Sequence, residues 1–200
     1  MKHGIILLGP PGSGKGTQAE LIIKELNIPP ISTGNILRHT MEQKTALAQE
    51  LKGYIEKGKL VPDELIDRIV AERLVHKDCK SGFLLDGFPR DLVQAKFVNT
   101  IIEVTHVIDL KVPDKFIIQR LAIRKRADDK PEVIKNRLNV YHRLTEPLIK
   151  YYKRQGILHE VDGVGTVKDI HRRIMKELKV DLRSPKKEYG FRFLYPLRNC

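Results

Sequence analysis

The chain has 200 residues, of which 41% are hydrophobic and 31% charged, and its formal net charge is +12. This length and composition are typical of one soluble globular unit, and no apolar stretch approaches the ~20 residues that a membrane helix needs. The N-terminal apolar run is too short for a signal peptide, so we expect a cytoplasmic protein without a membrane partner. Two cysteines, Cys79 and Cys200, are too few for a cysteine-based zinc site, and we expect both to be free thiols.

The positive charge favours an acidic ligand, which could be nucleic acid or a small polyphosphate, because both present phosphate oxygens. Charge alone does not separate the two. No zinc-finger spacing and no aromatic RNA-binding motif occurs in the sequence. We therefore expect no nucleic-acid partner, although a nucleic-acid-dependent ATPase stays open as an alternative.

Short apolar runs alternate with helical patterns along the chain. The runs at residues 5–8, 83–85, 104–110 and 157–161 predict buried strands. Helices are predicted over residues 15–26, 33–41, 46–56, 63–76, 92–99, 115–125, 132–154 and 168–179. This alternation is typical of an α/β protein with three layers, in which helices cover both faces of a parallel sheet. Ligands of such sheets bind at the carboxyl ends of the strands.

The last stretch departs from this pattern. We expect one domain over residues 1–182 and a basic, aromatic tail over residues 183–200. The tail is either loosely attached or an arm that docks on its own domain or a partner, and an arm of this kind could also fold over a bound nucleotide.

The segment GPPGSGKGTQ, residues 9–18, follows the first predicted strand and opens the first predicted helix. It matches the phosphate-binding pattern G-x-x-x-x-G-K, in which backbone N–H groups surround phosphate oxygens and Lys15 reaches the β/γ-phosphates. The strict pattern places Ser or Thr after the lysine, whereas this chain has Gly16 and then Thr17. The segment predicts a P-loop NTPase fold that binds a nucleoside triphosphate. ATPases, GTPases, kinases and helicases share this loop.

Three further segments narrow the choice: ISTGNILR from residue 31, GKLVPDELI from residue 58 and GFLLDGFPRDLVQ from residue 82. Together with the loop they resemble the adenylate kinase family of nucleoside monophosphate kinases, over about residues 4–178. Phosphoryl transfer needs two aligned phosphate ends, charge neutralisation and exclusion of water, and arginines suit that task.

The resemblance implies a role for each matching residue. Catalytic charge stabilisation falls to Lys15, Arg90, Arg124, Arg126 and Arg137. ATP would contact Gly12, Ser13, Gly14, Lys15, Gly16, Thr17, Arg124 and Gly165. AMP would contact Thr33, Gly34, Arg38, Lys59, Leu60, Val61, Gly87, Phe88, Pro89, Arg90, Gln94, Arg126 and Arg137. Gln94 would pair with the adenine edge through one donor and one acceptor. Asp86 would orient Mg²⁺ through water.

Two departures from the family pattern stand out. Asn35 replaces the usual aspartate, so a negative charge near the acceptor is lost. The lid that other members place between two arginines is reduced to about residues 124–128, while residues 32–61 keep the lobe that binds the monophosphate. Because lids exclude water, we expect some ATP hydrolysis in the absence of AMP.

The resemblance implies a monomeric enzyme that transfers phosphoryl reversibly from ATP to AMP, giving two ADP, with Mg²⁺ as cofactor. Thr33 and Gln94 look like the AMP-selective pair. Besides the nucleic-acid-dependent ATPase, two alternatives remain: a UMP/CMP kinase, and a nucleotide-binding regulator that has lost efficient transfer together with its lid.

Overall fold

The computed structural model describes residues 3–42, 45–57, 59–124, 126 and 128–182. The predicted tail, residues 183–200, lies outside the described residues, and so does Cys200. Within the described chain, no helix combines the length and the apolar character that crossing a membrane requires. Cys79 is a buried free thiol, as predicted.

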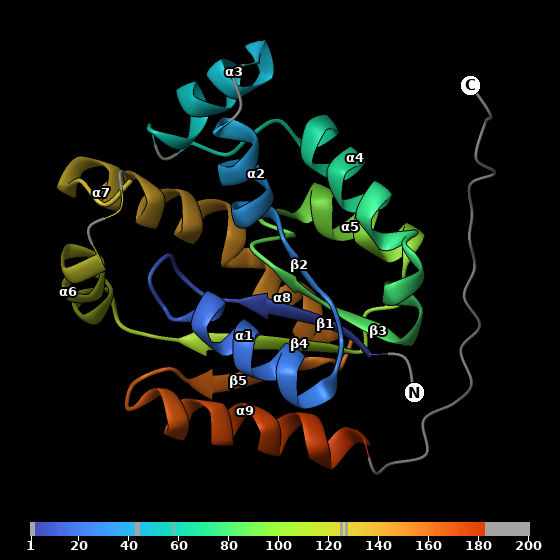
Figure 1. Cartoon of the computed structure of the whole chain (residues 1–200). Helices are drawn as coiled ribbons and strands as arrows, with labels where there is room; N and C mark the ends of the chain where they lie inside the picture. Colours follow the sequence, from blue (N-terminus) through green and yellow to red (C-terminus); the bar gives the residue numbers. More distant parts are fainter. Residues whose placement is uncertain (1–2, 43–44, 58, 125, 127, 183–200) are drawn as a thin grey trace, which may run out of the picture.

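One parallel sheet forms the centre of the molecule (Figure 1). Its strands are β1 (His3–Leu8), β2 (Pro30–Ser32), β3 (Gly82–Asp86), β4 (His106–Lys111) and β5 (Leu158–Asp162). They lie in the order β2-β3-β1-β4-β5, with every pair parallel. The P-loop follows β1, so the central position of that strand places the loop in the middle of the carboxyl edge.

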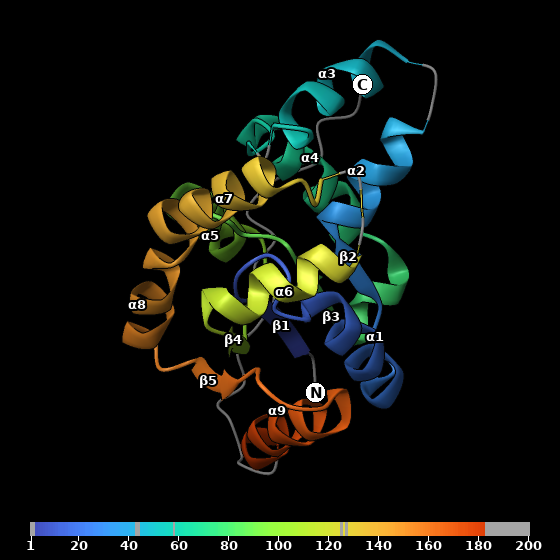
Figure 2. The same ribbon diagram turned by 90° about the vertical axis from the view of Figure 1, so that its left-hand side faces the viewer.

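Helices cover both faces of the sheet, as Figures 1 and 2 show. They are α1 (Lys15–Leu26), α2 (Thr33–Met41), α3 (Ala46–Ile55), α4 (Asp63–Leu74), α5 (Leu92–Ile101), α6 (Asp114–Arg124), α7 (Pro131–Val140), α8 (Pro147–Arg154) and α9 (Val167–Leu182). A short 3₁₀ helix, Lys77–Ser81, precedes β3, and a π turn, Tyr141–Thr145, joins α7 to α8. The predicted three-layer α/β architecture is confirmed.

Successive residues of β1 point to opposite faces and so belong to different cores. Ile5 and Leu7 pack with α1 and α9, whereas Ile6 and Leu8 pack with α4, α5 and α8. A third, smaller cluster lies beyond the end of β4 and consists of Val112, Ile117, Leu121, Ile134 and Leu138. All of these residues except Val112 come from α6 and α7, so this cluster fixes the helices on either side of the reduced lid.

Two local predictions are wrong. Residues 30–32 form the edge strand β2, which the sequence hid because Pro29 and Pro30 interrupt any apolar run. The single helix predicted over residues 132–154 is interrupted at the π turn, where the N–H of Glu146 bonds to the Tyr141 carbonyl at 2.9 Å. Pro147 has no N–H to continue a regular α-helical ladder, and the wider turn accommodates it.

Candidate active site

The P-loop forms the floor of a cleft of about 690 Å³. Gly9, Gly12 and Gly14 all have positive φ, which bends the backbone tightly around the start of α1. No side chain caps this helix and its first turn carries no acidic residue. The N–H groups at the helix start are therefore available to an anion. Residues 12–17, predicted to bind ATP, all line the cleft.

Lys15 turns back toward the loop that precedes it. Its ammonium donates to the carbonyls of Gly9 at 2.7 Å and Pro10 at 2.9 Å. Burial lowers the pKa of Lys15 to about 8, against the opposing effect of the nearby Asp86 carboxylate. The amine thus lies where phosphate oxygens would approach the loop, and a phosphate would favour its protonated form.

A second, smaller cavity of about 80 Å³ opens beside α2 and α4. Apolar side chains line one part of it, including Leu37, Ile55 and Ile66, and Arg38, Arg90 and Arg137 line another part. Residues 59–61 lie on its wall. This distribution suits a monophosphate whose base needs an apolar slot and whose phosphate needs cations. Other predicted acceptor residues that line this cavity are Thr33, Gly34, Gly87 and Gln94.

The Gly87 carbonyl joins the two parts of the acceptor cavity. It accepts from Thr33 Oγ1 at 3.0 Å and from Arg90 Nε at 2.8 Å. Pro89 lines the large cleft, whereas Phe88 is packed into the core with only 1% exposure. Phe88 lines neither of the two cavities, so the structure does not bring its side chain to the predicted contact with AMP.

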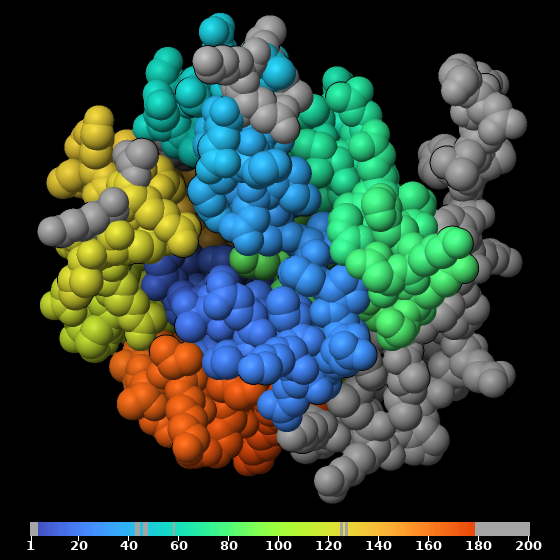
Figure 3. All heavy atoms as spheres, viewed as in Figure 1, coloured from blue at the N-terminus to red at the C-terminus, as the bar shows by residue number. Residues whose placement is uncertain are grey.

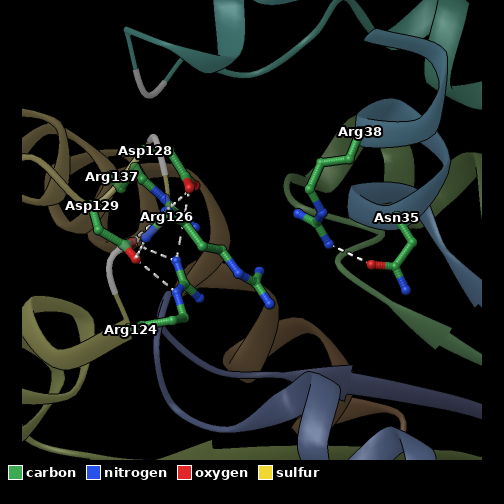
Figure 4. Close-up of polar contacts among 7 residues, drawn as sticks. All are labelled: Asn35, Arg38, Arg124, Arg126, Asp128, Asp129 and Arg137. Atoms are coloured by element: carbon green, nitrogen blue, oxygen red, sulfur yellow. Dashed lines mark hydrogen bonds and ion pairs between the residues drawn. The ribbon is translucent and has the colours of Figure 1, made fainter. Parts of the chain in front are cut away.

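The arginines from α6 and α7 face two aspartates at the reduced lid (Figure 4). Arg124 donates from two nitrogens to Asp129, at 2.9 and 2.6 Å, and Arg137 donates to Asp128. Figure 4 shows the Arg126 side chain pointing away from the aspartates and toward Arg38 across the gap. The hollow between α2 and the α6–α7 region is visible in the space-filling view (Figure 3).

On the opposite side of the gap, Arg38 donates to Asn35 Oδ1. Asn35 thus keeps the hydrogen bond that an aspartate would make, but its amide leaves the arginine's charge uncompensated. Burial lowers the pKa of Arg38, and the positive charge of Arg126 lowers it further. Burial has the same effect on the pKa values of Arg90 and Arg137. So many partly desolvated cations around one cleft create a strong preference for anions.

The residues present fit a magnesium ion held mainly by phosphates and water. Asp86 Oδ2 faces the P-loop. It lies 3.9 Å from the position that a Cβ atom would occupy if Gly16 had a side chain. The described residues contain no cluster of three or more His, Cys, Asp or Glu side chains suited to a metal. Mg²⁺ needs no such cluster, because it commonly binds one or two carboxylates together with water and substrate phosphates.

Sequence reasoning missed Arg120, which also lines the cleft. Its guanidinium donates to the carbonyls of Ser13 at 3.2 Å and Gly163 at 3.0 Å, so it links the P-loop to the segment after β5. Gly165, which we predict to contact ATP, lies in that segment and lines the cleft. Arg120 lies one helical turn before Arg124, and this i, i+4 spacing on a predicted helix was the signal that could have identified it.

Thr145 was missed as well, because its position depends on the π turn. Its hydroxyl donates to the Arg90 carbonyl at 2.7 Å, and the residue is 8% exposed. Nothing in the sequence around residue 145 marked it.

Comparison with known proteins agrees with this geometry. The family model described as adenylate kinase matches residues 7–157. The chain belongs to the adenylate kinase family. It is 49% identical over 184 residues to adenylate kinase 1 of Synechocystis, covering 90% of this chain and 98% of that protein. It is 46% identical over 183 residues to adenylate kinase of Leptospira biflexa, covering 87% and 98%.

A third adenylate kinase, from Caldicellulosiruptor bescii, is 39% identical over 213 aligned residues, covering 88% of this chain and 99% of that protein. These matches confirm the resemblance stated from the motifs, the P-loop NTPase fold, and the prediction of a nucleotide-binding phosphotransferase of the nucleoside monophosphate kinase class.

Proposed function

We propose that this chain catalyses the reversible, Mg²⁺-dependent transfer of a phosphoryl group from ATP to AMP, giving two ADP, as a cytoplasmic monomer. The observation that carries the proposal is the convergence of Lys15 and five predicted arginines on one cleft between the P-loop and the 32–61 lobe. The arginines are Arg38, Arg90, Arg124, Arg126 and Arg137. The names of the relatives support AMP and ATP as the substrates.

Catalysis in this site is positioning and charge neutralisation. The free N–H groups at the start of α1 and the Lys15 ammonium hold the β- and γ-phosphates of ATP. Arg38 and Arg90 hold the AMP phosphate, and Arg124, Arg126 and Arg137 neutralise the transferring group. No protein nucleophile or general base is required, because the AMP phosphate itself attacks in line.

Mg²⁺, when bound, supplies further neutralisation of the phosphate charge, with Asp86 as its protein anchor through water. Asp86 is suitably placed because it ends β3 at the same edge of the sheet from which the P-loop begins. Its Oδ2 accepts from Ser32 Oγ at 3.4 Å, which leaves the carboxylate free to accept from metal-bound water as well.

Within the part of the chain that the structure describes, little covers the donor end of the cleft. α6 ends at Arg124 and α7 begins at Pro131, so few residues are available for a lid. Ile123 lines the cleft and is 80% exposed. Water therefore reaches this side of the site, and slow ATP hydrolysis without AMP accompanies the transfer.

The proposal is tested by measuring ADP formation from ATP with AMP, CMP, UMP or GMP as acceptor. We expect AMP to be the preferred acceptor and Lys15→Met to abolish turnover while the circular dichroism spectrum stays unchanged. A preference for CMP or UMP would show that AMP is not the natural acceptor. ATP hydrolysis without phosphorylation of any acceptor would overturn the kinase assignment. The same assay without acceptor measures the expected leak.

A further inference from the structure

The Gln94 side-chain amide is held at both ends. Its Oε1 accepts from the Arg90 backbone N–H at 2.7 Å, and its Nε2 donates to Asp63 Oδ1 at 2.6 Å. The orientation follows from the partners, since a backbone N–H can only donate and a carboxylate accepts. Gln94 is 2% exposed, so these bonds are shielded from water.

Turning this amide by 180° would be costly. The carbonyl oxygen would then face the Asp63 carboxylate, and the NH₂ group would face the Arg90 N–H. Two buried polar contacts would be replaced by two repulsive ones, one of them involving a full charge. Asp63 is the first residue of α4, where the positive end of the helix dipole favours a carboxylate.

The amide still has one N–H and one oxygen lone pair for a ligand. Gln94 lines the acceptor cavity together with apolar side chains from α3 and α4, Ile55 and Ile66. A 6-aminopurine presents an N–H donor beside a ring-nitrogen acceptor. A 6-oxopurine in the same position presents the reverse order, an oxygen acceptor beside a ring N–H donor. Only one of the two matches an amide that cannot turn.

We propose that Asp63 is a specificity-determining positioning residue, which fixes the Gln94 amide in the orientation that accepts a 6-aminopurine monophosphate and rejects a 6-oxopurine monophosphate. This inference rests on the proposed function, in which Gln94 faces the acceptor base. Asp63 acts through Gln94 and does not itself touch the nucleotide.

The test compares AMP with IMP, which differ in the 6-amino and 6-oxo groups and the ring proton that accompanies them. Asp63→Asn keeps the shape, but its amide can reverse together with that of Gln94, so we expect the ratio of kcat/KM for AMP to that for IMP to fall about tenfold or more. Asp63→Ala removes the contribution of Asp63 and leaves the Arg90 N–H alone to orient the Gln94 amide, so the ratio should fall as well. Thermal unfolding of each variant verifies that it is folded.

Glu64→Gln is the matched control. Glu64 is exposed and lies in the same first turn of α4, so its replacement removes the same charge from the same helix end. The wild-type ratio should be retained. A wild-type ratio in both Asp63 variants, or an equal fall in Glu64→Gln, would overturn the inference.

Failure of the proposed function is recognised separately. A wild-type protein that phosphorylates AMP but shows no effect of Asp63 refutes the Asp63 inference alone. A wild-type protein that does not phosphorylate AMP refutes the proposed function. In that case calorimetric titration with AMP and with IMP still compares the variants, because the preference is expected in binding as well as in turnover.

Discussion

Arg124 binds Asp129 through both arms of a bidentate ion pair, from Nε at 2.9 Å and from Nη2 at 2.6 Å. The Asp129 side chain is only 2% exposed, and it also accepts from the Arg126 N–H at 2.8 Å. The Asp129 carboxylate thus occupies N–H donors of an arginine that we propose to bind phosphate. The same carboxylate fixes the position of the short connection between α6 and α7.

We expect Asp129→Asn to lower the free energy of unfolding by about 2 kcal/mol, because it weakens charge-assisted bonds that are shielded from water. Burial acts to raise the pKa of Asp129, but the hydrogen bonds from Arg124 and Arg126 outweigh it and hold the pKa below its ordinary value. The stability that comes from a lowered pKa is present above the ordinary pKa of aspartate and is lost as the pH falls through the folded-state pKa, so the difference should begin to shrink below about pH 4.

Urea denaturation at neutral and acidic pH measures both effects. Glu42→Gln is the control, since Glu42 and its partner His39 are 77% and 80% exposed, and it should change stability by less than about 0.5 kcal/mol. An equal loss of unfolding free energy in the two variants would show that the ion pair of Asp129 with Arg124 does not stabilise the fold more than an exposed pair does.

Binding of ATP is expected to take up protons above neutral pH. Free Lys15 has a pKa of about 8, and a phosphate beside it would raise that value. At about pH 8.5 roughly 0.7 proton should therefore be bound per ATP. Calorimetric titration in two buffers with different ionisation enthalpies measures the uptake. Lys15→Met should show none, and a wild-type value near zero would mean that Lys15 is already fully protonated in the free protein.

Thr145→Val is expected to lower kcat by about tenfold, because the hydroxyl no longer fixes the Arg90 carbonyl and a small displacement of this proposed catalytic arginine would be costly. Thr100→Val is a matched control: Thr100 Oγ1 also donates to a carbonyl at 2.7 Å, but on the exposed surface of α5. Steady-state kinetics of both variants measures the effect. Equal rates in the two variants would show that the hydrogen bond to Arg90 does not matter.

Asp67→Asn should stabilise the protein at neutral pH. Burial and the charges of Asp63 and Asp91 raise the pKa of Asp67 to about 6, and one of its carboxylate oxygens is buried without a hydrogen-bond partner. The ionised Asp67 carboxylate therefore destabilises the folded state. Because Asp67 is only half-buried, we expect a gain of about 1 kcal/mol after allowance for screening by solvent.

A carboxyl group whose pKa is raised in the folded state loses this penalty on acidification, so the gain should shrink between pH 6 and pH 4. Thermal unfolding of the wild type and the variant across this range measures the change. Glu72→Gln, on the exposed side of the same helix, should leave stability nearly unchanged at every pH. A gain that does not depend on pH would exclude Asp67 ionisation as its cause.

Local signals predicted most of the fold. The bounds of α1 and α2 were predicted to the residue, and Gly14, the last glycine of the loop before Lys15, marks where α1 can begin. Strand β2 escaped prediction since its pairing with β3 is a property of the sheet rather than of three residues. The interruption at Tyr141–Thr145 escaped because the apolar spacing of α7 continues into α8 in the same helical period.

The candidate site divides in the same way. Lys15 was predicted from the spacing of the phosphate-binding loop, and Arg90 from the resemblance of a contiguous segment to the family pattern. Thr145 and Asp63 depend on contacts between distant segments, with 55 positions separating Thr145 from Arg90 and 31 separating Asp63 from Gln94. No local pattern encodes such pairs. The ion pairs of Asp128 with Arg137 and of Asp129 with Arg124 likewise could not be predicted from the sequence.

Gly12 connects the phosphate-binding loop to the small cluster beneath α6. A Cβ at this position would lie 2.8 Å from Cγ of Leu121, a fully buried residue of that cluster. The same helix carries Arg120 and Arg124, and α7, which shares the cluster, carries Arg137. The arginines that we propose for ATP binding and for transition-state stabilisation are therefore held by the same packed cluster, so a substitution that disrupts this cluster should weaken ATP binding and lower kcat together.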